Sequence, residues 1–254
     1  MARIDAFFKL MHEKKASDLP LVAGQQPGLR IQGEMERVKF KVLDNDELKG
    51  MLYEITPEEK IKTFEETGDV DFAYEIPGLA RYSSNFFQQN FGVGAVFREI
   101  PSEILSTEEL GLPPVVAKLA MLPRGLVLVT GPTGSGKSTS LAAIIDESNQ
   151  KRKDHIITIE DPVEPIHHHK GCLISQREVG DHTEGFASAL RSALREDPDV
   201  ILVGEMRDPD TIRLALTAAA TGHLVLGPLH TSSAPKPIDR ITDVFPAPQK
   251  ERFR

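Results

Sequence analysis

Hydrophobic positions in the first hundred residues follow two spacings, one typical of helices and one typical of strands. Apolar residues recur three and four positions apart over residues 2–15, which predicts an amphipathic helix. Residues 69–75 alternate between apolar and polar, which predicts a strand with one buried face. Further strand patterns lie at residues 29–35, 82–88 and 93–99. This mixture predicts a small α+β domain over residues 1–100.

A capping-box signature predicts the start of a second helix in this domain. Thr56 and Glu59 stand three positions apart, and Pro57 takes the first helical position, where a proline is tolerated. Ile61 and Phe64 follow at a spacing that gives this helix a buried face.

The pattern changes after residue 100. Prolines and glycines mark a linker over residues 101–113, and strands then alternate with helices in a domain that we expect over residues 114–254. Short apolar runs predict strands covered on both faces, at residues 126–130, 155–159, 200–203 and 224–229. Helical patterns lie between them at residues 138–149, 185–195 and 210–221. The succession predicts an α/β domain with a mostly parallel sheet.

Composition and charge narrow the class of protein. The 254 residues contain 40% apolar and 27% charged residues, which is typical of a soluble globular chain. A net charge of −8 argues against a dedicated nucleic-acid binder. The single cysteine, Cys172, excludes an internal disulfide and favours a reducing cytosol. We expect neither a signal peptide nor a transmembrane segment.

A glycine-rich motif carries the clearest chemistry. Residues 131–138 fit G-x-x-x-x-G-K-[ST], between a predicted strand and a predicted helix, which is the context a phosphate-binding loop requires. Lys137 is expected on the β- and γ-phosphates of a nucleotide and Ser138 on Mg²⁺. The expected nucleotide-binding residues here are Gly131, Pro132, Thr133, Gly134, Ser135, Gly136, Lys137, Ser138 and Thr139.

Acidic residues follow two of the predicted buried strands. Glu205 comes after the strand at 200–203 and is a candidate for the base that activates water, although an acid there could instead cap the next helix near Asp208. Glu160 and Asp161 follow the strand at 155–159, where parallel sheets bind ligands, although acids before a proline also begin ordinary loops.

Histidines near the last strand and in one loop have open interpretations. His223 and His230 flank the strand at 224–229, and either could sense a phosphate or be a satisfied polar residue. Residues 167–169 are three histidines without metal-type spacing partners, which predicts a solvated turn.

Six blocks together resemble the type II/IV secretion ATPases, and within them the pilus-retraction ATPases, the PilT-like twitching-motility motors. The amino-terminal residues 15–19 and 85–101 also resemble the PAS-like module of that family. The resemblance implies a RecA-like P-loop NTPase domain preceded by a smaller PAS-like domain. The blocks that carry it are residues 131–138, 157–164, 176–180, 193–199, 204–208 and 221–231.

The resemblance also implies roles for individual residues. Lys137 and Ser138 would hold ATP and Mg²⁺, and Glu205 would be the catalytic base of an ATPase that forms ADP and phosphate. Glu160 and His230 match active-site positions. Arg81 and Arg98 match arginines that reach the phosphates from the amino-terminal domain, although surface arginines are usually only solvated.

The implied assembly is a hexameric ring that works with the pilus machinery at the cytoplasmic face of the inner membrane. Assembly-type relatives carry a four-cysteine zinc insert, and the single cysteine here favours the retraction branch. The family pattern has threonine where Pro228 stands and arginine where Ser83 stands, and it continues into a helical tail, so we expect a domain truncated at its carboxyl end. These departures motivate an alternative: a ring subunit that binds nucleotide but is not a competent motor. A nucleic-acid translocase is disfavoured by the net charge.

Overall fold

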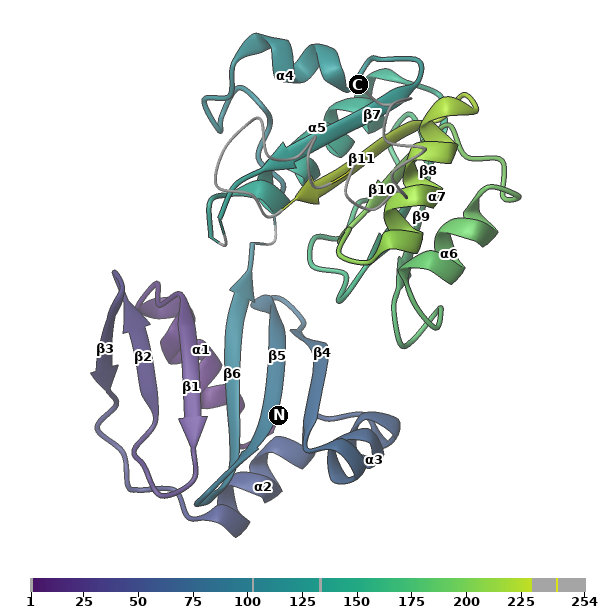
Figure 1. Cartoon of the computed structure of the whole chain (residues 1–254). Helices are drawn as coiled ribbons and strands as arrows, with labels where there is room; N and C mark the ends of the chain where they lie inside the picture. The colour runs from purple at the N-terminus through teal and green to yellow at the C-terminus, as the bar shows by residue number, and fades with distance from the viewer. Residues whose placement is uncertain (1, 102, 133, 230–240, 242–254) are drawn as a thin grey trace. The chain divides into compact units, whose positions relative to one another are not determined.

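The computed structural model describes residues 2–101, 103–132, 134–229 and 241, and the chain divides into two compact units, Met1–Ser102 and Glu103–Arg254 (Figure 1). Each unit has its own sheet. Within the described ranges, no helix combines the length and the apolarity needed to cross a membrane.

The first unit is built on a six-stranded antiparallel sheet with the order β3-β2-β1-β6-β5-β4. Three helices contribute side chains to a single core with this sheet. The helices are α1 (Asp5–Glu13), α2 (Asn45–Tyr53) and α3 (Glu58–Thr67). The strands are β1 (Asp18–Val22), β2 (Gly28–Ile31), β3 (Glu34–Arg37), β4 (Asp69–Ile76), β5 (Ala80–Gln89) and β6 (Gly92–Ile100).

Aromatic rings fill the centre of that core. Phe8 of α1 lies 4.3 Å from the ring of Tyr82 and 4.8 Å from that of Phe97, centroid to centroid. Phe86 packs edge-on against Phe97 at 5.8 Å. Tyr82 and Phe86 belong to the buried half of an alternating strand, so the period-2 pattern of β5 selects which face receives the helices.

The predicted capping box at the start of α3 is wrong. The Thr56 hydroxyl donates to the Leu52 carbonyl oxygen at 2.7 Å, four residues earlier in the chain at the end of α2. Pro57 is the N-cap of α3, without a side-chain hydrogen bond. Phe64 is buried as expected, whereas Ile61 is only half-buried.

The second unit is built on a five-stranded parallel sheet with the order β7-β11-β10-β8-β9. This is the predicted parallel sheet. Its strands are β7 (Gly125–Thr130), β8 (His155–Glu160), β9 (Leu173–Glu178), β10 (Val200–Val203) and β11 (Leu224–Leu229). Its helices are α4 (Pro114–Leu119), α5 (Lys137–Lys151), α6 (Phe186–Ala193) and α7 (Pro209–Ala220).

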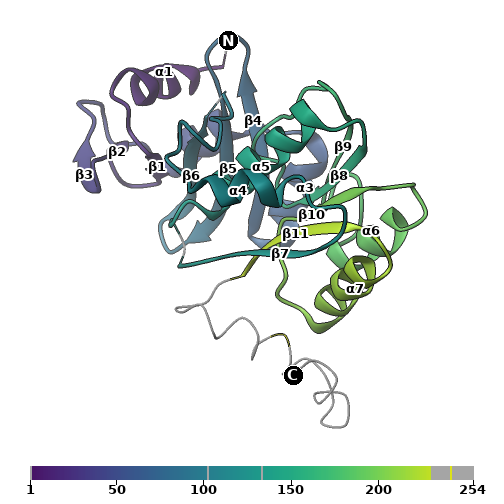
Figure 2. The same ribbon diagram turned by 90° about the horizontal axis from the view of Figure 1, so that it is seen from above.

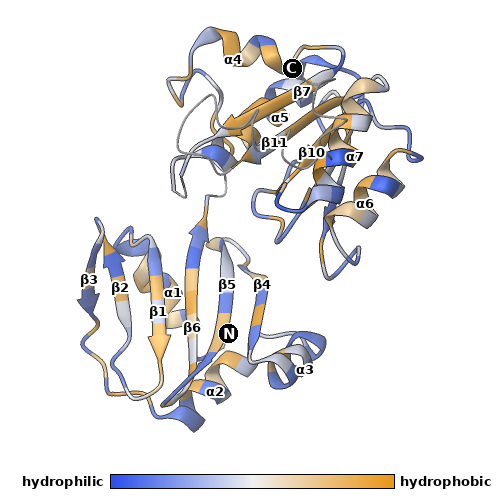
Figure 3. Cartoon of the chain, viewed as in Figure 1, coloured by the Kyte–Doolittle hydropathy of each residue, from blue (hydrophilic) through white to orange (hydrophobic). Residues whose placement is uncertain are grey.

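Both faces of this second sheet are covered, which explains the continuous apolar runs. Helices α6 and α7 cover one face of the sheet and α5 covers the other (Figure 2). Ile157 and Ile201 belong to a core shared with α6 and α7, whereas their neighbours Ile156 and Leu202 belong to a second core shared with α5. Strand β10 is therefore apolar along its whole length, whereas β5 of the first unit alternates between buried and half-buried residues (Figure 3).

Candidate functional site

The predicted phosphate-binding loop connects β7 to α5. Gly134 and Gly136 have φ angles of +77° and +83°, a region that residues with a side chain rarely adopt. Gly136 is also the N-cap of α5, and as a glycine it has no side chain to cap that helix end. The first backbone N–H groups of a 15-residue helix are therefore directed at the loop, which is the arrangement that binds phosphate.

The side chain of Lys137 folds back over this loop. Its side chain is buried, and its ammonium donates to the Pro132 carbonyl oxygen at 2.7 Å. The Ser135 hydroxyl donates to the same oxygen at 2.8 Å. Ser138 and Thr139 lie exposed on the first turn of α5. Thr133 lies outside the described residues.

A cavity of about 110 Å³ lies beside the loop, at the carboxyl ends of β8 and β10. Ser138 forms one wall of it, and three acidic residues form another. The sheet topology thus brings together side chains that the sequence separates by tens of residues. The lining residues are Ser138, Leu141, Ala142, Glu160, Asp161, Pro162, Glu164, Pro165, His167, Leu202, Gly204 and Pro228.

Glu160 is the buried acid of this cavity. The Thr158 hydroxyl donates to its Oε1 at 2.5 Å, and the Gln176 amide donates to the same oxygen at 3.2 Å. Burial raises the pKa of the Glu160 carboxyl above its ordinary value, and these two hydrogen bonds oppose the rise.

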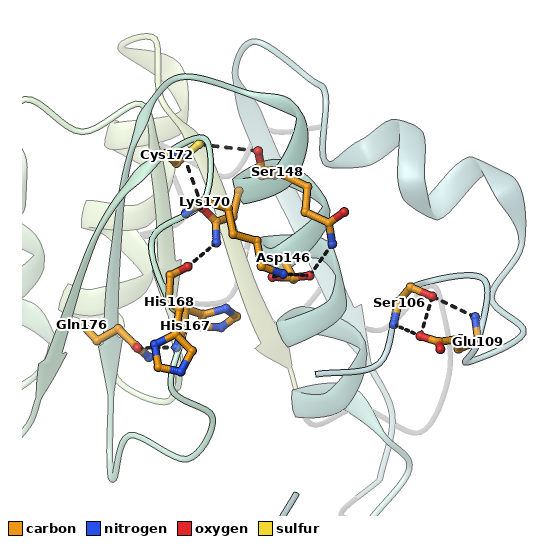
Figure 4. Close-up of polar contacts among 11 residues, drawn as sticks. Ser106, Glu109, Asp146, Ser148, His167, His168, Lys170, Cys172 and Gln176 are labelled. Carbon is orange, nitrogen blue, oxygen red and sulfur yellow. Dashed lines mark hydrogen bonds and ion pairs between the residues drawn. The ribbon is translucent and has the colours of Figure 1, made fainter. Parts of the chain in front are cut away.

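Gln176 organises the loop that follows β8. Its amide nitrogen also donates to the Pro165 carbonyl oxygen at 2.9 Å, and its amide oxygen accepts from the backbone N–H of His167 at 2.8 Å (Figure 4). Glu178 adds another anchor, since its Oε2 accepts from the Val163 N–H at 2.9 Å. The sequence alone does not predict this role for Gln176, although a glutamine and a glutamate stand at alternate positions of a short strand.

The expectation of a solvated histidine turn is wrong for one of its three residues. His168 and His169 are exposed, but His167 is only 5% exposed and lines the cavity. The hydrogen bond from its backbone N–H to Gln176 holds this part of the loop against β9, where the His167 side chain is buried.

Glu205 lies at the end of β10 but is not among the described residues that line the cavity. Its carboxylate is half-buried and forms an ion pair with Arg207. The alternative in which Glu205 caps α7 is wrong, because Asp208 is the N-cap and its Oδ1 accepts from the Thr211 N–H at 2.8 Å.

Gly204 allows β8 and β10 to approach at the floor of the cavity. A Cβ at this position would lie 2.9 Å from the Ile159 carbonyl oxygen and 3.2 Å from the Cα of Glu160. Its backbone N–H donates to the same Ile159 oxygen at 2.7 Å. A side chain before Glu205 would therefore force these strand ends apart.

Pro228 removes fewer hydrogen bonds from the sheet than a proline in an interior strand is expected to remove. It is paired with Val129 of β7, and the last pair between β10 and β11 is Leu202 with Leu226. The Leu224 N–H donates to the Asp199 oxygen, so by alternation the nitrogen of residue 228 faces Val203, beyond the last pair. The ladder to β7 continues past the proline.

The remaining candidates lie elsewhere. Arg81 and Arg98 belong to the first unit, on the sheet face opposite the core, and Arg98 donates to the Asp18 carboxylate through Nε at 3.0 Å and Nη2 at 2.8 Å. His223 is a satisfied polar residue, with Nδ1 2.9 Å from the Ala218 oxygen at the end of α7. His230 lies outside the described residues.

Comparison with known proteins places this chain in a family. Residues 96–249 match the family model described as "Type II/IV secretion system protein". The chain is 56% identical, over 94% of its length and 70% of the relative's, to the type IV pilus retraction ATPase PilT of Pseudomonas aeruginosa. It is 54% identical, over 90% of its length and 61% of the relative's, to a twitching motility protein of Neisseria gonorrhoeae.

Solved structures give the same assignment. A crystal structure of the pilus retraction motor PilT with bound ADP superposes with a TM-score of 0.92 at 47% identity, covering all of this chain and 74% of that one. The Legionella pneumophila ATPase DotB superposes with a TM-score of 0.84 at 30% identity, covering 98% of this chain and 71% of that one. The resemblance seen in the sequence is confirmed: the chain belongs to the type II/IV secretion system protein family.

Proposed function

We propose that this protein is an ATPase that converts ATP to ADP and phosphate in a pilus-retraction motor. The observation that carries the proposal is the uncapped start of α5, with its glycine loop and Lys137, beside a cavity lined by carboxylates. Relatives named as a pilus retraction ATPase and a twitching motility protein support the motor assignment.

The donor set fits a magnesium nucleotide. The Ser138 hydroxyl and the carboxylates of Glu160, Asp161 and Glu164 line one cavity, and Mg²⁺ prefers such oxygen ligands. Among the described residues, no three acidic, histidine or cysteine side chains are grouped so that they could hold a metal ion. When bound, Mg²⁺ neutralises phosphate charge during the transfer.

The protein's own groups divide the remaining work. The N–H groups of the loop and the Lys137 ammonium hold the phosphates, which requires Lys137 to exchange the Pro132 oxygen for a phosphate oxygen. Glu205 acts as the base that accepts a proton from the attacking water, and this requires its carboxylate to leave Arg207. Glu160 holds polar groups around the cavity, and His230 is proposed as a further active-site residue.

The rest of the proposed assembly follows the family. The second unit would be a RecA-like domain and the first a PAS-like domain whose Arg81 and Arg98 reach the nucleotide. Six copies would form a ring that acts with the pilus machinery, as a cytoplasmic protein held peripherally at the inner membrane. No nucleic-acid partner is proposed.

A second candidate is a ring subunit that binds nucleotide without being a competent motor. Two features favour it. The proposed base Glu205 is paired with Arg207, and a proline, Pro228, stands on the cavity wall where the family pattern has threonine.

Phosphate release, ADP binding and mass in solution, measured on one preparation, separate the two candidates. An ATPase loses turnover in Glu205→Gln and keeps ADP affinity, whereas Glu184→Gln, at an exposed acid outside the cavity, changes neither. Nucleotide binding without turnover in the unaltered chain would favour the second candidate. No nucleotide binding would refute both.

A further inference from the structure

His167 carries a buried polar side chain that the proposed reaction does not use. The residue is 5% exposed, and neither ring nitrogen has a hydrogen-bond partner among the described residues. A buried group without a partner costs about 1–3 kcal/mol, so such groups are rare and call for a ligand or water. His167 is one of the residues that line the same cavity as Ser138 and Glu160.

The backbone around His167 is fixed on both sides. Its own N–H donates to Gln176, and the carbonyl oxygen of His168 accepts from the Asn149 amide at 2.8 Å. Lys170 then forms an ion pair with Asp146 of α5, with Nζ 2.6 Å from Oδ1 (Figure 4). The backbone around His167 is therefore fixed, while its ring nitrogens make no hydrogen bond among the described residues.

The charge of the residues that line the cavity indicates which kind of ligand binds next to His167. Glu160, Asp161 and Glu164 line it, and burial lowers the pKa of His167 to about 4, so the imidazole is neutral near pH 7. A cavity with carboxylates and no protonated imidazole attracts a cation rather than a second phosphate. Its volume of about 110 Å³ holds about three to four waters at roughly 30 Å³ each.

We infer that the imidazole of His167 hydrogen-bonds a water in the hydration shell of the divalent cation that accompanies a nucleotide bound at Lys137 and Ser138. Mg²⁺ usually keeps several waters in protein sites, so a neutral imidazole has partners there. The inference rests on the proposed nucleotide site. It makes His167 a binding residue for the cation rather than for the phosphates.

The test compares ADP affinity in EDTA with ADP affinity in excess Mg²⁺, by calorimetry on the full chain. Removal of a polar contact to a metal's ligands typically costs 10–100-fold in metal affinity. In His167→Leu we therefore expect the gain in ADP affinity from Mg²⁺ to fall about tenfold, with affinity in EDTA unchanged. His167→Gln should retain part of the gain, and His168→Leu, at the exposed neighbour, should behave as wild type.

The free energy of unfolding of His167→Leu separates a role in cation binding from a purely structural role. Leucine removes an unpartnered polar group, so the free energy of unfolding of His167→Leu should equal or exceed that of the wild type without ligand. A purely structural histidine would instead lose stability and keep its Mg²⁺ response.

Other outcomes overturn the inference in distinct ways. An unchanged Mg²⁺ gain in His167→Leu would remove His167 from the cation site. Lost affinity in EDTA would assign it to the phosphates instead. If the wild type bound no ADP in either buffer, the proposed nucleotide site itself would be refuted, and this inference with it.

Discussion

The close approach of β8 and β10 at Gly204 can be tested by adding a single methyl group. In Gly204→Ala the new Cβ would lie 2.9 Å from the Ile159 carbonyl oxygen and 3.2 Å from the Cα of Glu160, both of which are backbone atoms. Neither can turn aside as a flexible side chain would, so the strand ends must separate by several tenths of an ångström. Overpacking of this kind costs about 1–3 kcal/mol.

Urea unfolding followed by circular dichroism measures this cost. Gly185→Ala is the matched control, because a Cβ there meets nothing within 4 Å and its φ of 173° is open to alanine. All three tyrosines, Tyr53, Tyr74 and Tyr82, lie in the first unit, and the chain has no tryptophan, so tyrosine fluorescence reports on that unit alone.

We expect Gly204→Ala to lower the dichroism midpoint well below that of Gly185→Ala while changing the tyrosine signal less. The separation should also disturb Glu160, so ADP affinity should fall in the same variant. Equal midpoints for the two alanine variants would refute the argument that the glycine is needed for the approach of these strands.

Further predictions concern the remaining site residues. Burial raises the pKa of Glu160, so the native protein binds more protons there than the unfolded chain does. Its stability therefore falls as pH rises from about 4.5 through the raised pKa. Glu160→Gln, which can still accept from Thr158, should flatten this fall in urea titrations from pH 4 to 8. Pro228→Ala should raise the free energy of unfolding by at most about 0.5 kcal/mol, because the nitrogen of residue 228 lies beyond the last pair with β10, and a rise equal to a full hydrogen bond would contradict this. Glu205→Gln should lower turnover by roughly 10²–10⁴ with ADP affinity kept, as phosphate release and calorimetry would show. Arg98→Ala should lose most ATP hydrolysis yet bind ADP normally; wild-type turnover in that variant would remove Arg98 from the site.

The sequence predicts the elements whose physical cause is local. The apolar run of β11 was placed at its observed bounds, and the loop before α5 was found because its glycines and Lys137 occupy fixed spacings. Helix α2 was missed although Asp44 caps it and its buried residues recur at helical spacing, so that signal was present in the sequence. Strand β9 was missed because it lies at the sheet edge, where polar residues interrupt the apolar pattern.

The site was harder to predict because its geometry comes from neighbouring strands rather than from spacing. Nothing in the sequence near Glu205 shows that Arg207 pairs with it, and the buried position of His167 depends on Gln176, nine residues later. Thr56 is a different case, because its hydroxyl bonds the carbonyl oxygen four residues earlier, a local alternative to the capping box that the sequence also allows. The roles of the site residues stay predictions.

The position of Gln176 and Glu178 on an edge strand has a consequence for how such a site can change over time. The central strands β8 and β10 are covered on both faces, so almost any substitution in them disturbs a core. Among the described strands, β9 has a neighbour on one side only, yet two of its side chains hold the loop that forms the outer wall of the cavity. Residues at the tolerant edge of the sheet can therefore reshape that wall, and diversify what it accepts, while the interior strands stay under strict constraint.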